Sequence, residues 1–151
     1  MTMTLSGKLL IDTNILIYAT MGSDPRHGIS KEVLDLRRSS GNQLFVSVQN
    51  LSEIYPNSTG PKAQPPDSPG LARKKITSLS GLPGVKVLPI TLETVFLALE
   101  IAERYGVTRQ RYFDMQIVAS MLLEEIPTLV TENVNDFEGI VEIRCVNPFL
   151  D

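Results

Sequence analysis

The apolar run Leu9-Leu10-Ile11, which ends at Asp12, constrains the fold more than any other segment of the chain. A short aliphatic run bounded by a turn signal is typical of a strand buried in a parallel sheet. Asp12 then lies at the carboxyl end of this strand, where open α/β sheets place their ligand sites. A second apolar run, Leu129-Val130-Thr131, leads to Asn133 and Asp136. Two strands are therefore expected to bring polar side chains to one edge of a sheet.

The hydrophobic pattern along the chain alternates between strands and helices. Strands are expected at residues 8–11, 44–48, 128–131 and 141–146, and helices at residues 15–20, 30–38, 71–79, 92–105 and 113–124, with a further helix that Ser47 caps. The segment 85–90 contains Pro89, which lacks a donor for a strand ladder, so it is expected at the edge of the sheet or outside it. The alternation predicts an α/β fold with a parallel sheet covered by helices on both faces.

Two segments carry more specific expectations. Residues 56–70 contain five prolines and two glycines, and we expect a long surface loop there, inside a single domain that spans residues 1–151. The helix that follows Thr91 carries an apolar stripe, which we expect to face the core. The members of this stripe are Leu92, Val95, Phe96, Leu99 and Ala102.

Composition limits the classes of protein that the chain can represent. With 151 residues, 42% of them hydrophobic, the chain is long enough to bury a core. One cysteine and one histidine exclude zinc sites of the Cys or His type. The apolar runs are too short to cross a bilayer, and the start of the chain lacks a signal-peptide pattern, so the expected location is the cytoplasm. A net charge of −3 argues against extended nucleic-acid binding but allows local contacts with phosphate.

Four acidic residues are the candidates for chemistry: Asp12, Glu53, Asp114 and Asp136. Each has an ordinary structural alternative: Asp12 and Asp114 as helix caps, Glu53 as an exposed glutamate, and Asp136 as a turn residue. Two carboxylates about 4 Å apart repel each other by about 4 kcal/mol at an effective dielectric constant near 20. A cluster of them therefore needs a cation or a proton, and Mg²⁺ favours such oxygen ligands.

Four motifs occur in an order that resembles the PIN-domain family. They are LLIDTN, SVQNLSEIY, YFDMQIVAS and TLVTENVNDFEG, with VNPF closing the chain. The pattern is most similar to VapC-like toxins of type II toxin–antitoxin pairs. The resemblance implies a three-layer α/β/α sandwich with a central parallel sheet of four to five strands. It also implies an endoribonuclease dependent on Mg²⁺ or Mn²⁺, in which a metal-activated water attacks the RNA phosphodiester.

The resemblance also assigns roles to residues. Metal ligands and catalytic acids are implied at Asp12, Glu53, Asp114 and Asp136, with Asn133 as a further metal-facing residue. Asn14 and Thr131 match polar positions that support such a site. Arg109 and Arg111, just before Asp114, are candidates for contact with an RNA phosphate, and surface solvation explains them equally well.

The resemblance also implies partners, and two other functional hypotheses compete with the nuclease. The family implies an RNA substrate, a cognate antitoxin whose basic side chain enters the acidic cleft, and a homodimer without membrane contact. A second hypothesis is a non-catalytic PIN-like module that binds RNA or a protein partner. A third is a different α/β phosphoryl-transfer enzyme. A dehalogenase-like phosphatase needs a second aspartate where this chain has Asn14, and the acid and lysine pattern of a receiver domain is missing.

Overall fold

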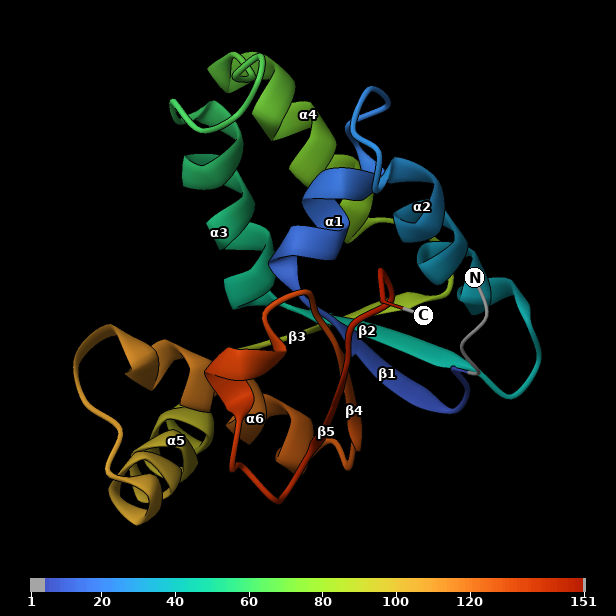
Figure 1. Cartoon of the computed structure of the whole chain (residues 1–151). Helices are drawn as coiled ribbons and strands as arrows, with labels where there is room; N and C mark the ends of the chain where they lie inside the picture. Colours follow the sequence, from blue (N-terminus) through green and yellow to red (C-terminus); the bar gives the residue numbers. More distant parts are fainter. Residues whose placement is uncertain (1–4, 151) are drawn as a thin grey trace.

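Five parallel strands form the centre of the protein, in a computed structural model that describes residues 5–150 (Figure 1). Their order across the sheet is β3-β2-β1-β4-β5, and every neighbouring pair is parallel. The bounds are β1 Lys8–Ile11, β2 Gln43–Ser47, β3 Val85–Leu88, β4 Thr128–Val130 and β5 Arg144–Val146. The predicted α/β fold with a parallel sheet is confirmed.

Helices cover both faces of this sheet. Figure 1 shows α1 to α4 on one side and α5 with α6 on the other. The bounds are α1 Thr13–Ala19, α2 His27–Asp35, α3 Val48–Thr59, α4 Pro69–Ser80, α5 Leu92–Tyr105 and α6 Tyr112–Leu123, with 3-10 turns η1 Leu36–Arg38, η2 Arg109–Arg111 and η3 Val134–Phe137. Within residues 5–150, no helix is long and apolar enough to cross a membrane.

The alternation of side chains along each strand divides the core into two layers. Leu9 and Ile11 of β1 pack against α1 to α4, whereas Leu10 packs against α5 and α6. All three side chains are fully buried. This explains why the strand is apolar throughout: in a sheet covered on both faces, every position of a central strand faces a core.

The segment with Pro89 was predicted at the edge of the sheet or outside it, and the edge position is confirmed, because β3 is the outermost strand beside β2. The last strand was predicted over residues 141–146 but begins only at Arg144. Val141 lies in a turn with 84% of its surface exposed, so it has no core to face. An apolar side chain alone therefore gave a strand prediction three residues too long.

The loop predicted for residues 56–70 is much shorter in the structure. Helix α3 continues through Pro56 to Thr59, and α4 begins at Pro69, so the connection covers only residues 60–68. Pro56 removes the amide that would bond to the Ser52 carbonyl, but both residues are exposed and water can serve that oxygen. Pro69 occupies the first turn of α4, where no amide partner is needed.

The orientation of α5 also differs from the prediction. Thr91 caps this helix and Gly106 ends it in the left-handed conformation, as expected. The helix nevertheless turns Ala98, Ile101 and Ala102 inward and leaves the apolar side chains of Leu92, Phe96 and Leu99 exposed. Small inward residues allow α5 to pack closely on α6, and that packing decides its rotation. The homodimer stays a prediction, and the exposed face of α5 is a surface that it could use.

Candidate active site

A cavity of about 550 Å³ opens where the parallel strands end. Its walls come from the start of α1, from α3 and α6, and from the segment that follows β4. Six of the predicted site residues line it: Asp12, Asn14, Glu53, Asp114, Asn133 and Asp136. The tertiary structure therefore brings to one cavity side chains that lie up to 124 positions apart in the chain.

Asp12 is the most firmly held of these acids. Its backbone amide donates to the Val130 carbonyl at 3.0 Å, which keeps the end of β1 beside β4. Its carboxylate accepts hydrogen bonds from the Thr13 amide at 2.8 Å, from Asn50 Nδ2 at 3.1 Å and from the Thr131 hydroxyl at 2.8 Å. Burial raises its pKa above the usual range, while the bonds from Thr131 and Thr13 act in the opposite direction. Asp12 thus caps α1 and also faces the cavity.

Asn14 and Thr131 join the two strand ends behind Asp12. The Asn14 amide group donates to the Thr131 hydroxyl oxygen at 3.3 Å and its carbonyl oxygen accepts from the Glu132 amide at 3.1 Å. Thr131 is fully buried and its hydroxyl oxygen also accepts from the Asn133 amide at 3.0 Å. These bonds hold the segment after β4 against the start of α1.

Glu53 is oriented by a chain of hydrogen bonds that sequence analysis did not identify. Gln49 Nε2 donates to Glu53 Oε1 at 2.9 Å and to the Phe113 carbonyl at 3.0 Å. Gln49 Oε1 in turn accepts from Gln116 Nε2 at 2.8 Å, and Tyr112 donates to Gln116 Oε1 at 3.0 Å. This network ties α3 to α6. The spacing of Gln49 and Glu53, four residues apart on one helix, is the sequence signal that could have indicated their pairing.

Asp114 lies in the first turn of α6 and does not cap the helix. Burial, together with the negative charges of Asp136, Asp12 and Glu53 and against an opposing effect of Arg111, raises the pKa of Asp114 to about 6. Burial likewise raises the pKa of Glu53, to which Asp12 adds. The acids therefore share one electrostatic environment with an excess of negative charge.

The donors around this cavity fit a hard divalent cation, because they are carboxylate and amide oxygens. Within residues 5–150, the acidic side chains do not form a ready-made group of three metal ligands. The oxygen donors nevertheless suit such an ion in their chemistry.

A further acid on the cavity wall, Glu132, is neutralised by a cluster that sequence analysis also missed. Arg26 forms an ion pair with Glu132 at 3.0 Å and a second one with Asp24 at 2.9 Å. The Arg26 guanidinium lies 3.8 Å from the centre of the Tyr18 ring, and the Tyr18 hydroxyl also contacts Glu132. Burial raises the pKa of Tyr18 to about 12, with Glu132 adding to the shift. Glu132 is thereby held in a structural contact with Arg26 and Tyr18.

The two arginines suggested as phosphate contacts are not among the described residues that line the cavity. Arg111 donates to the Asp136 carbonyl at 3.0 Å and so lies near the rim. Arg109 has a positive φ of 56° in the turn before α6. Their suggested contact with RNA stays a prediction.

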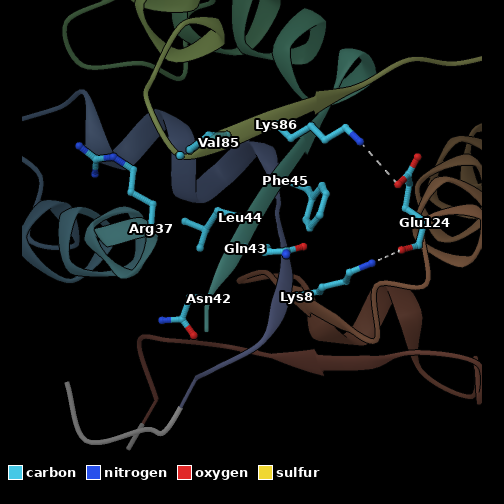
Figure 2. A pocket seen from close by; sticks show the side chains of 10 residues that line it. Lys8, Arg37, Asn42, Gln43, Leu44, Phe45, Val85, Lys86 and Glu124 are labelled. Carbon is cyan, nitrogen blue, oxygen red and sulfur yellow. Dashed lines mark hydrogen bonds and ion pairs between the residues drawn. The ribbon is translucent and has the colours of Figure 1, made fainter. Parts of the chain in front are cut away.

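A second cavity, of about 570 Å³, lies at the opposite ends of the strands (Figure 2). Figure 2 shows Lys8 and Lys86 both directed at Glu124. Lys8 donates to the Glu124 carbonyl at 2.9 Å, and Lys86 lies 3.9 Å from the Glu124 carboxylate. Lys8 and Lys86 therefore already have a partner in this second cavity. The predicted acids line the cavity at the other ends of the strands, which is the better candidate site.

Comparison with known families identifies the family of this chain. The family model of the PIN domain matches residues 9–140. The chain belongs to the PIN family. The matched range contains all the site residues predicted for this chain, from Asp12 to Asp136. No curated protein matches its sequence.

Solved structures with the same fold include a toxin and a toxin–antitoxin complex. A toxin–antitoxin complex from Klebsiella pneumoniae matches this PIN domain with a TM-score of 0.64 and 20% identity, over 95% of this chain and 99% of that chain. VapC20 of Mycobacterium tuberculosis, described as a toxin that cleaves the sarcin-ricin loop, matches with a TM-score of 0.67 and 19% identity, over 90% and 98%. FitAcB of Neisseria gonorrhoeae matches with a TM-score of 0.64 and 18% identity, over 93% and 97%. These low identities establish a shared fold.

Proposed function

We propose that this PIN domain is an endoribonuclease that uses Mg²⁺ or Mn²⁺, and that it is the toxin of a type II toxin–antitoxin pair. The observation that carries the proposal is the convergence of Asp12, Glu53, Asp114 and Asp136 on one cavity. Membership of the PIN family and likeness to toxins such as VapC20 support the reaction class and the biological role.

The proposed cation ligands are Asp12 and Asp114, with Glu53, Asp136 and Asn133 as further oxygen donors. Asp12 suits this role because three donors orient its carboxylate toward the cavity. A bound divalent ion supplies a more acidic water and offsets negative charge on the phosphate. Asp114 would be ionised when it holds the cation, against the burial and the neighbouring acids that raise its pKa.

The chain's own residues then bind and orient the reacting groups. Asp12 and Asp114 would hold the cation, and a cation bound there would supply a positive charge for the scissile phosphate. Glu53, held by Gln49, is the proposed acceptor of the proton from the attacking water. The new oxygen–phosphorus bond replaces the bond to the departing ribose oxygen, which takes up a proton from solvent. Arg111 at the rim is a proposed contact for a neighbouring phosphate.

Gln49→Leu is expected to lower the rate of RNA cleavage about 10-fold, since loss of a residue that orients a ligand costs roughly 10–100-fold. Leucine keeps the volume but cannot donate to Glu53 or accept from Gln116. The rate is measured with saturating RNA, and thermal unfolding checks that the variant is folded. An unchanged rate in a folded variant contradicts the positioning role of Gln49.

The proposed antitoxin is a protein that places a basic side chain in the acidic cavity. Structures similar to this chain include VapBC complexes bound to DNA from Rickettsia felis and Salmonella typhimurium. The excess of negative charge in the cavity supports a cationic group as its occupant. A bound antitoxin would thereby compete with the cation and with RNA.

The function is tested with the purified chain and a panel of end-labelled RNAs that contain single-stranded loops. Discrete fragments are expected with Mg²⁺ or Mn²⁺, none with EDTA, and recovery when excess metal is restored. Attack by water leaves no 2′,3′-cyclic phosphate, which distinguishes this reaction from that of contaminating metal-independent ribonucleases. If RNA binds but stays intact under all metal conditions, the non-catalytic PIN-like module becomes the better explanation.

A further inference from the structure

Lys62 brings a positive charge to the acidic cavity. It is the only lysine or arginine among the described residues that line this cavity. It lies in the short connection between α3 and α4. None of the ion pairs described within residues 5–150 engages its ammonium group.

The connection that carries Lys62 is held in place by specific contacts. At its start, a Cβ atom on Gly60 would lie 2.9 Å from the Pro56 carbonyl, so the turn after α3 requires glycine. At its end, the Asp67 amide donates to the Ser58 carbonyl at 2.8 Å. The Asp67 carboxylate pairs with Lys75 at 2.9 Å. The position of Lys62 beside the cavity is therefore a consequence of a folded connection.

The excess of negative charge in the cavity indicates what Lys62 can bind. Five carboxylates line the cavity: Asp12, Glu53, Asp114, Glu132 and Asp136. Arg26 divides its charge between Glu132 and Asp24, and none of the ion pairs described within residues 5–150 engages the other four acids. One divalent cation still leaves a net negative charge, which repels the phosphates of an approaching RNA strand. A flexible lysine at the rim is suited to pair with such a phosphate as a point charge.

We propose that Lys62 binds an RNA phosphate next to the one that is cleaved and so guides a single strand across the acidic cavity. This inference rests on the proposed ribonuclease function and adds a substrate-binding position to it. A lysine that contacts only phosphate increases affinity equally for all sequences. Lys62 is therefore a binding residue that leaves the choice of sequence to other contacts.

The test compares Lys62→Met with Lys74→Met. Lys74 is exposed on the adjacent helix α4, outside the cavity, so the control removes the same charge. Both changes are made in an Asp12→Asn background, which prevents cleavage, and binding of a fluorescent single-stranded RNA is measured by anisotropy with Mg²⁺ from about 50 to 200 mM salt. Lys62→Met is expected to weaken binding several-fold and to reduce the salt slope by about 0.7 to 1. Lys74→Met is expected to bind like the background protein, and Lys62→Arg to restore affinity.

Each result decides between specific alternatives. Equal binding by the Lys62→Met and Lys74→Met proteins overturns the assignment of Lys62 but leaves the nuclease proposal standing. Tighter binding by Lys62→Met also overturns it and indicates that the lysine shields the acids from RNA. A background protein that binds no RNA at all overturns this inference, because Lys62 is intact in it, and cleavage of end-labelled RNA by the unmodified chain then decides the nuclease proposal separately. The thermal unfolding midpoint is expected to be unchanged in both variants, because both side chains are exposed.

Discussion

Asp12→Asn is expected to lower RNA cleavage by more than about 100-fold, because even residues that only support metal ligands contribute roughly 10–100-fold. Asparagine matches aspartate in shape and can keep its one side-chain oxygen toward the Thr13 amide, but its amide nitrogen then faces the Thr131 hydroxyl, which donates to the second oxygen of Asp12. The change therefore removes the negative charge at the centre of the cavity together with one hydrogen bond, and thermal unfolding checks that the variant is folded. Cleavage of end-labelled RNA with Mn²⁺ measures the loss, and calorimetry measures the accompanying loss of Mn²⁺ affinity.

The matched control is Asp35→Asn, which makes the same chemical change on an exposed side chain outside the cavity. This variant is expected to cleave RNA at the rate of the unmodified protein. Expression in bacteria gives a second readout, in which Asp12→Asn is expected to relieve growth arrest and Asp35→Asn is not. Equal Mn²⁺ affinity and equal cleavage in the Asp12→Asn and Asp35→Asn proteins would remove the basis of the proposed function.

Asp114→Asn is expected to lower cleavage to a similar extent while making the metal-free protein more stable at neutral pH. The folded-state pKa of Asp114 is about 6, mainly through burial, against an ordinary value of 3.8. A raised carboxyl pKa means that the ionised group destabilises the fold, so its unfavourable effect appears as pH rises from about 4 to about 7. Removing the charge is expected to increase the free energy of unfolding by on the order of 1 kcal/mol at pH 7.5.

Thermal unfolding in EDTA at several pH values measures this effect. The two proteins are expected to unfold at the same temperature near pH 4 and to differ by about 2–4 °C at pH 7.5. Asp24→Asn is the control of opposite sign, because the hydrogen bond and ion pair with Arg26 lower the pKa of Asp24 and its ionised form stabilises the fold. Added Mn²⁺ is expected to stabilise the unmodified protein more than Asp114→Asn. An Asp114→Asn protein that is less stable than the unmodified one in EDTA at pH 7.5 contradicts the crowding of charge in the cavity.

Sequence patterns were sufficient for the fold class and for the polar residues that follow the strands. Asp12 and Asn133 follow buried strands, and parallel strands end at one edge, so their proximity follows from topology. Glu53 and Asp114 lie on helices, and their place at the same cavity came from the resemblance to PIN domains. Periodicity alone could not place them, because it does not say how far each helix is rotated about its axis.

Other features depended on contacts between distant segments. The Gln49 network spans α3 and α6, and Arg26 reaches Glu132 across 106 positions of the chain. Proline content predicted an irregular segment at Pro56, but the exposed side of α3 tolerates the lost hydrogen bond. In each case the outcome was decided by solvent access and by neighbours that local sequence does not specify.

By itself, the amino-acid sequence determined the alternation of strands and helices, because the spacing of apolar residues is a local property that each element satisfies against any core. It also determined that acids follow the strands. Only the tertiary structure decided which face of α5 is buried, how Gln49 holds Glu53, and that Lys62 lies beside the acids. The physical reason is that packing fixes helix rotation and loop position through interactions that span the whole chain.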